Sequence, residues 1–400
     1  MDTELKSIEK APKKRISKIL LAVVITAVIS VFISFIAFYM IFLSSDKYIS
    51  FSELDFLIDS YYYGDVDKEK MNDSALKGYV NGLDDRFSNY YNAQETEKRS
   101  DTLSGSAEGI GIIVTRYPDT QNIYINNVYE GAPAAKAGLI AGDCIIAIDS
   151  VSVSDTGYAQ AVGSIIREIG DKVKLTVLRD GKTFDITVEY AEFKAQSVFW
   201  QITEDNYGYV EITSFNDETV VQFKNAVNQL TEKKVDGFIF DLRGNGGGTV
   251  SSVTEMVDLL CPEGTVMTVK YSDGEEEIMA KSDSEEINLP MTVLTDSLTA
   301  SASELFAASI KDFKKGVTVG ETTFGKGVMQ TTYNLTGGSS VVLTVAEFFP
   351  HSGNSFNKTG IEPDIKIELN EEQRKYINQL TLSEDPVVIA AIGYLNRNEK

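Results

Sequence analysis

The 400 residues contain a single histidine and two cysteines. A hydrolase without a usable histidine needs another base for its nucleophile, and a desolvated lysine is the main alternative. His351 lies between Pro350 and Gly353 in a turn-like sequence, which disfavours a Ser–His–Asp triad built on it. Cys144 and Cys261 fall in or beside apolar runs, so we expect buried free thiols rather than a disulfide. One histidine and two separated cysteines do not form a Cys/His zinc set, and we expect no metal and no cofactor.

Basic charge is also scarce: 37 Lys and Arg residues stand against 59 Asp and Glu, a formal net charge of −22. Nucleic-acid binding depends on neutralising phosphates with Lys and Arg, so nucleic acid is not an expected partner. Residues 1–18 carry a net charge of +3, whereas the rest of the chain is strongly acidic. We interpret residues 1–18 as a cytoplasmic basic tail.

Residues 19–43 contain no charged side chain. At about 1.5 Å per residue, this run is long enough to cross the ~30 Å of a bilayer core. A cleaved signal peptide is the main alternative, but the run is too long for its apolar region and has no clear small-x-small cleavage site. The basic tail predicts that the N-terminus stays in the cytoplasm and that the chain after Ser44 is extracytoplasmic, on a single membrane anchor.

The next segment, 44–100, is predicted to be a mostly helical arm, because apolar residues recur in it at helical spacing. At the other end, residues 371–400 are predicted to be a helical segment. The arm and the stretch 380–395 are the surfaces on which we expect a possible homodimer.

Residues 101–190 change to short strands separated by turns, with a helix expected at 158–168. Asp180-Gly181 separates two apolar strands and is a strong signal for a two-residue hairpin. The string from Gly131 to Asp149, GAPAAKAGLIAGDCIIAID, resembles a PDZ domain. Such a module binds a peptide C-terminus by strand addition. The resemblance places the peptide-binding backbone at Gly109, Ile110, Gly111 and Ile112.

From residue 191 to 370, apolar strands alternate with amphipathic helices, which indicates an α/β core. Ser301 stands where one helix is expected to begin, before Glu304. This pattern fits a helix-capping box. It equally fits a nucleophile, because the free N–H groups at a helix N-terminus, including that of Ala302, can stabilise an oxyanion. The partner of Ser301 must decide between the two.

Lys326 lies between two glycines in an apolar neighbourhood. A solvated turn lysine is one interpretation, but burial lowers the pKa of a lysine and allows it to act as a base. Gln330 has the same strand-face parity and could orient the amine without adding charge. The glycine-rich turn DLRGNGGG, residues 241–248, lacks the Gly-Lys-Ser/Thr of a phosphate loop. A second oxyanion donor at Gly247 fits it better.

Together these motifs resemble the C-terminal processing peptidases, or tail-specific proteases. The resemblance rests on DLRGNGGG, on TASASE at 299–304 and on TFGKGVMQ at 323–330, and it extends to LDDRFSNY at 83–90 and GIEPDI at 360–365. Two positions depart from the family pattern: Thr299 replaces a serine, and Gly246 stands where proline is frequent. The resemblance implies a ClpP/crotonase-like protease core with an inserted-style PDZ domain. It makes Ser301 the nucleophile, Lys326 the general base and Gln330 the lysine-orienting residue. Gly247 and Ala302 become the oxyanion hole.

The resulting prediction is a membrane-anchored, extracytoplasmic serine endopeptidase acting on proteins with exposed apolar C-termini. In this family an arginine in the peptide-binding helix can sense bound peptide, and Arg167 is a candidate, with a solvated helix arginine as the alternative. A non-catalytic PDZ adaptor is the second hypothesis, which loss of Ser301 or Lys326 would have favoured. An acyl-CoA enzyme of the crotonase group is the third, and the anchor and the peptide module fit it poorly.

Overall fold

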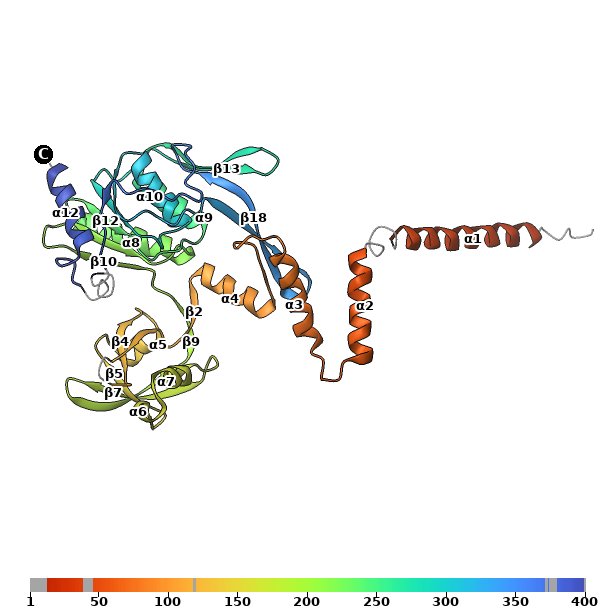
Figure 1. Ribbon diagram of the computed structural model, residues 1–400, viewed down its shortest axis with the longest axis horizontal. Helices are drawn as coiled ribbons and strands as arrows, with labels where there is room; N and C mark the ends of the chain where they lie inside the picture. Colours follow the sequence, from red (N-terminus) through yellow and green to blue (C-terminus); the bar gives the residue numbers. More distant parts are fainter. Residues whose placement is uncertain (1–12, 39–45, 118–119, 371–372, 374–379, 399–400) are drawn as a thin grey trace, which may run out of the picture. The chain divides into compact units, whose positions relative to one another are not determined.

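The computed structural model describes residues 13–38, 46–117, 120–370, 373 and 380–398 (Figure 1). The chain forms two compact units, residues 1–74 and 75–400. The first contains helix α1, Lys13–Phe38, helix α2, Asp46–Tyr61, and the start of α3, Lys68–Asn81. An 18-residue window of α1, Leu20–Ala37, has a mean hydropathy of 2.8 and is long and apolar enough to cross a membrane. Residues 39–43 of the predicted anchor lie outside the described residues.

The predicted arm is helical in α2, α3 and α4, Ala93–Ser104, but it also contains a strand that the sequence did not indicate. Strand β1, Asn89–Tyr91, pairs antiparallel with residues 340–342 of the α/β core. Helix α4 has a complete capping box, in which Asn92 and Glu95 exchange side-chain and backbone hydrogen bonds. The end of the arm is therefore part of the second unit.

A six-stranded antiparallel sheet forms most of residues 106–190, with β3 at one edge. The Asp180-Gly181 hairpin is confirmed, and both turn residues have the positive φ, 49° and 74°, that such a turn needs. Outside this sheet, β2, Ser106–Gly109, pairs with β9, Ala191–Lys194, so paired strands join both ends of the domain to the core. The other elements are β3 Ile112–Arg116, β4 Ile123–Val128, α5 Pro133–Ala137, β5 Cys144–Ile148, β6 Val151–Ser152, α6 Val153–Thr156, α7 Tyr158–Ile165, β7 Lys172–Arg179 and β8 Lys182–Glu189.

The α/β core is built on a second six-stranded sheet, in the order β10-β11-β12-β15-β16-β19. Its strands are parallel except β10. Helices α8, α9 and α10 share one buried apolar cluster with this sheet, while α12 packs into another. The bounds are β10 Val198–Ile202, β11 Gly208–Ile212, α8 Asp217–Glu232, β12 Phe238–Asp241, α9 Val250–Leu260, β15 Met291–Thr295, α10 Ala302–Asp312, β16 Gly316–Gly320, β19 Ile365–Lys366 and α12 Pro386–Asn398.

A further sheet, in the order β1-β18-β13-β14 with β17 beside β18, completes the core. Its strands are β13 Gly264–Tyr271, β14 Glu276–Ser282, β17 Val328–Asn334 and β18 Ser340–Phe349, with the 3-10 turn η2 at Thr336–Gly338. Helix α12 lies in the predicted C-terminal helical segment. It buries Val388, Ala391 and Leu395 completely, so one of its faces is occupied by the core itself. Both cysteines are buried free thiols, as expected.

Candidate active site

Ser301 lies immediately before α10, in a backbone conformation that side-chain-bearing residues rarely adopt. Its φ is 59° and its ψ is −115°. Strained turns of this kind between a strand and a helix expose catalytic serines in other hydrolases. Here the turn connects β15 to α10, and an ordinary helix cap does not require such strain. The conformation therefore favours the nucleophile interpretation of Ser301.

The glycine-rich loop is tied to the Ser301 segment by several hydrogen bonds. The Asn245 carbonyl oxygen accepts from Ala300 N at 3.0 Å and from Ser303 Oγ at 3.0 Å. Thr299 Oγ1 donates to the Leu242 carbonyl oxygen at 2.9 Å. A threonine hydroxyl makes this bond as a serine hydroxyl would, so the departure at Thr299 keeps the connection between the two segments.

Gly247 packs directly against Ser301, the predicted nucleophile. Its φ is 101°, and a Cβ added there would lie 2.7 Å from the Ala300 carbonyl oxygen and 2.9 Å from Ser301 Cβ. Its N–H donates to Asn245 Oδ1 at 2.8 Å. An oxyanion at this position therefore has to share the Gly247 N–H with Asn245 Oδ1, or it has to displace the Asn245 side chain. The roles of Gly247 and Ala302 as oxyanion donors stay predictions.

Replacing Gly247 with alanine is expected to reduce kcat/KM by about 10²- to 10³-fold, the usual cost of losing one oxyanion donor. The added methyl group collides with the Ser301 segment, and the residue keeps a φ that favours glycine. Gly274→Ala is the matched control, because Gly274 has a φ of 90° and a methyl group added there would have no neighbouring atom within 4 Å. Equal losses in the two variants would show a backbone effect rather than an effect at the nucleophile.

Glu304 connects Ser301 to the loop that carries Lys326. Its carboxylate is fully buried and accepts hydrogen bonds from Ser301 N at 2.9 Å and Lys326 N at 2.8 Å. Gly325 N at 2.7 Å and Thr323 Oγ1 at 2.5 Å donate to its other oxygen. The sequence indicated Glu304 only as a capping residue. No local signal pointed to the lysine loop, which folds back on α10 from about 20 residues further along the chain.

Lys326 is partly buried, and its pKa is lowered from the usual value of a lysine. Burial is the largest cause, and the charge of Arg99 is the next. Asp85 and Glu304 act in the opposite direction. A lower pKa populates the neutral amine, the form that can accept a proton from a serine. Among the described residues, no hydrogen bond joins Lys326 Nζ to Ser301 Oγ.

The Gln330 side chain makes different contacts from those we predicted. Its Nε2 donates to the Val328 carbonyl oxygen at 3.1 Å and to Thr344 Oγ1 at 3.4 Å. Lys326 precedes β17, and a register shift lies between Met329 and Gln330, so strand parity does not relate the two side chains. Orientation of the lysine by Gln330 stays a prediction.

The lone histidine is engaged elsewhere. His351 Nδ1 lies 2.9 Å from the Thr265 carbonyl oxygen, and its ring stacks on Phe313 at a centroid distance of 4.1 Å. Neither partner contributes to the Ser301 site. This arrangement agrees with the sequence argument against a histidine triad.

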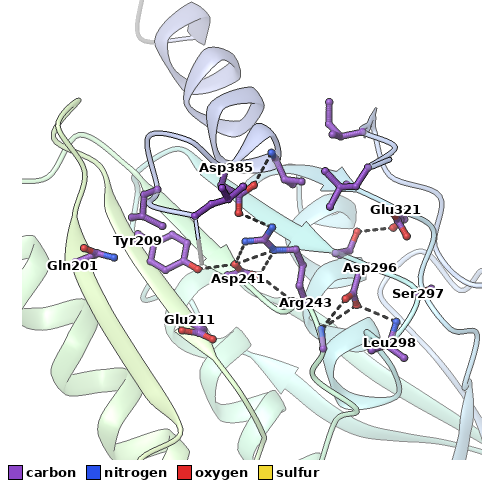
Figure 2. Close-up of a pocket in the computed structure, with 18 residues that line it drawn as sticks. Gln201, Tyr209, Glu211, Asp241, Arg243, Asp296, Ser297, Leu298, Glu321 and Asp385 are labelled. Carbon is purple, nitrogen blue, oxygen red and sulfur yellow. Dashed lines mark hydrogen bonds and ion pairs between the residues drawn. The ribbon is translucent and has the colours of Figure 1, made fainter. Parts of the chain in front are cut away.

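A cavity of about 580 Å³ lies at the carboxyl ends of the parallel strands (Figure 2). Neither Ser301 nor Lys326 lines it. Its central cation, Arg243, pairs with Asp241 and lies 2.8 Å from Asp385 in the segment before α12. Burial opposes the charge of Arg243, but the two carboxylates outweigh it and raise the pKa of the guanidinium. The arginine of the DLR motif thus links the glycine-rich loop to the C-terminal segment.

In the predicted peptide-binding domain, β3 is an edge strand of its sheet, as strand addition would require. The predicted peptide-binding residues Gly109, Ile110, Gly111 and Ile112 lead from the end of β2 into the first residue of β3. Gly111 has a φ of 77°, and a Cβ there would lie 2.2 Å from Ala132 Cβ. Arg167 lies beyond the end of α7 and binds Asp149 at 2.6 Å. Its contact with a peptide stays a prediction.

Comparison with known proteins identifies the family of the chain and its second domain. The model of peptidase family S41 matches residues 206–367, and a PDZ-domain model matches residues 106–190. The carboxy-terminal processing protease CtpA of Bacillus subtilis (strain 168) is 35% identical over 314 residues, covering 78% of this chain and 67% of that protein. The chain belongs to peptidase family S41. It is a serine protease of the C-terminal processing type.

A second relative, the carboxy-terminal processing protease CtpB of the same organism, is 31% identical over 318 residues, covering 78% of this chain and 66% of CtpB. A solved structure from Bacteroides fragilis NCTC 9343, assigned to the S41 proteases, has a TM-score of 0.58 at 18% identity and covers 84% of this chain and 93% of its own. That likeness supports the mixed α/β fold. The finer likeness to ClpP and the crotonases stays a prediction.

Proposed function

We propose that this S41 protease is an anchored endopeptidase that captures exposed C-terminal tails with its PDZ domain and cleaves by a serine–lysine mechanism. The observation that carries the proposal is the Glu304 carboxylate, which binds the backbone of both Ser301 and Lys326. A single buried group thereby fixes the relative position of the nucleophile segment and of a lysine with a lowered pKa.

In the proposed reaction, Lys326 Nζ in its neutral form accepts the proton of Ser301 Oγ as the oxygen attacks the scissile carbonyl carbon. The oxyanion accepts hydrogen bonds from the N–H groups of Ala302 and Gly247. The lysinium returns its proton to the leaving amine, and an acyl-enzyme remains. Water, activated by the same lysine, then releases the new C-terminus. Gln330 is proposed to orient the amine after moving from its contacts with Val328 and Thr344.

The location follows from α1 and its flanks. A span of high hydropathy preceded by a basic tail favours an anchor with a cytoplasmic N-terminus and an extracytoplasmic protease. The proposed substrates are unfolded proteins with apolar C-termini, paired to the edge of β3. A homodimer remains part of the proposal through the exposed apolar side chains of the arm, such as Phe51 and Phe56 in α2.

The test is cleavage of an unfolded protein with an apolar C-terminus by the full chain in detergent, beside Ser301→Ala. We expect the parent to cleave, and the variant to bind a tail peptide without cleaving. Binding without cleavage by both proteins, even with a tail peptide added as activator, would instead favour the adaptor hypothesis. Equal cleavage by both would remove Ser301 from the mechanism.

A further inference from the structure

The residues around Lys326 include part of the N-terminal arm, which the proposed mechanism does not use. Strand β1 pairs with β18, and Ser88 Oγ accepts a hydrogen bond from Thr344 N at 3.0 Å. The Asp85 carboxylate accepts from Phe87 N at 3.0 Å and from Ser88 Oγ at 2.6 Å. These bonds fix the backbone of residues 85–91 against the sheet that follows the lysine loop.

The fixed segment places an aromatic ring on the lysine. Lys326 Nζ lies 4.7 Å from the centroid of the Phe87 ring, within cation–π distance. The Arg86 guanidinium lies 4.6 Å from the same ring and 4.7 Å from that of Phe324. Phe324 is itself two residues from Lys326, so the arm and the lysine loop make a joint aromatic surface beside the amine.

We propose that Phe87 is a positioning residue of the catalytic centre, whose ring covers Lys326 Nζ, limits its access to water and holds the amine near the nucleophile. The inference rests on the proposed role of Lys326 as the base. It assigns the motif LDDRFSNY a function: this stretch completes the active site from more than 200 residues upstream.

Two opposing effects of the ring act on the amine. Its π face attracts the charged ammonium and so favours protonation. Its bulk removes water from the ammonium, and burial is the largest cause of the lowered pKa of Lys326. The charged groups facing the amine are Arg99 from α4, Asp85 and Arg86 from the loop before β1, and Glu304 from α10. Because burial dominates, loss of the ring is expected to raise the pKa of Lys326.

Substitutions separate the two effects. Phe87→Ala removes both the cover and the π face, Phe87→Leu keeps most of the cover without the π face, and Phe87→Tyr keeps both. Phe199→Ala is the control, since Phe199 is another partly buried phenylalanine, in β10. Thermal unfolding of each full-length variant checks that it is folded.

The first readout does not depend on proteolysis. Competitive acetylation of the full chain across pH, with mass spectrometry of each lysine, reports the titration of Lys326. We expect its midpoint to move to higher pH in Phe87→Ala, to stay at or below the parent value in Phe87→Leu, and to be restored in Phe87→Tyr. An unchanged Lys326 titration in folded Phe87→Ala would overturn the inference, and the Leu and Tyr variants decide the matter if the Ala variant does not fold.

The second readout is the pH profile of kcat/KM. We expect Phe87→Ala to lose about 10- to 100-fold near neutral pH, the scale of a misplaced catalytic group, and to regain part of the loss as the amine deprotonates at higher pH. An equal loss at every pH with normal Lys326 titration would assign Phe87 a structural role and overturn the inference. If parent and Ser301→Ala cleave equally, the proposed function fails. The acetylation result still shows whether the Phe87 ring affects the titration of Lys326.

Discussion

Replacement of Lys326 by alanine is expected to lower kcat/KM for an unfolded protein by about 10⁴-fold, because general-base catalysis of serine attack is lost. Lys326→Arg should be as inactive as the alanine variant: a guanidinium keeps the positive charge but does not deprotonate in the accessible pH range. The measurement is the initial cleavage rate of the full-length parent and variants.

The control for this prediction is Lys281→Ala, at an exposed position of β14, which should cleave at the parent rate. Tail-peptide binding should survive in all three variants, since Lys326 lies outside the PDZ domain. Normal cleavage by Lys326→Ala would place the base elsewhere and return His351 to consideration.

Replacement of Glu304 by alanine is expected to destabilise the protein by at least about 3 kcal/mol and to remove activity. The truncation leaves up to four donors without their acceptor: the N–H groups of Ser301, Gly325 and Lys326, and the Thr323 hydroxyl. Each buried donor left unsatisfied costs about 1–3 kcal/mol. The free energy of unfolding in denaturant and kcat/KM of the remaining folded protein are the two measurements.

A matched control separates this effect from ordinary helix capping. Glu95 occupies the same capping position in α4, but it is partly exposed. Glu95→Ala should therefore cost only about 1 kcal/mol, as a lost cap does, and leave kcat/KM unchanged. Similar costs for the two substitutions would mean that Glu304 is a capping residue and that its bonds to the lysine loop contribute little.

Glu304→Gln tests the two-sided link more finely. The amide keeps the size of the side chain, but only one of its two terminal atoms accepts hydrogen bonds. One side of the connection, either to Ser301 and Lys326 or to Thr323 and Gly325, must then weaken. We expect a free energy of unfolding between those of the parent and the alanine variant. We also expect kcat to fall by a larger factor than KM changes, because the proposed nucleophile and base are misaligned.

Local sequence determined the elements that carry the site. The alternation of apolar strands and amphipathic helices predicted for the core is present, for example in helix α9, Val250–Leu260, and strand β15, Met291–Thr295, because apolar periodicity and flanking turn residues act over a few positions. The Asp-Gly hairpin follows from the positive φ that its turn needs. Motif resemblance correctly identified the protease family and the PDZ domain.

Long-range packing decided what the sequence did not show. Strand β1 is a three-residue segment that exists as a strand through its pairing with β18, about 250 residues away. The capping pattern of Glu304 described its contact with Ser301 and gave no sign of its contact with the lysine loop. The contact of Phe87 with Lys326 likewise joins two segments that are far apart in the sequence, and no local periodicity predicts it. The sequence by itself determined the local elements and singled out Ser301 and Lys326 as the candidates for catalysis. Only the tertiary structure decided which groups surround these two residues, because burial and electrostatics depend on neighbours in space.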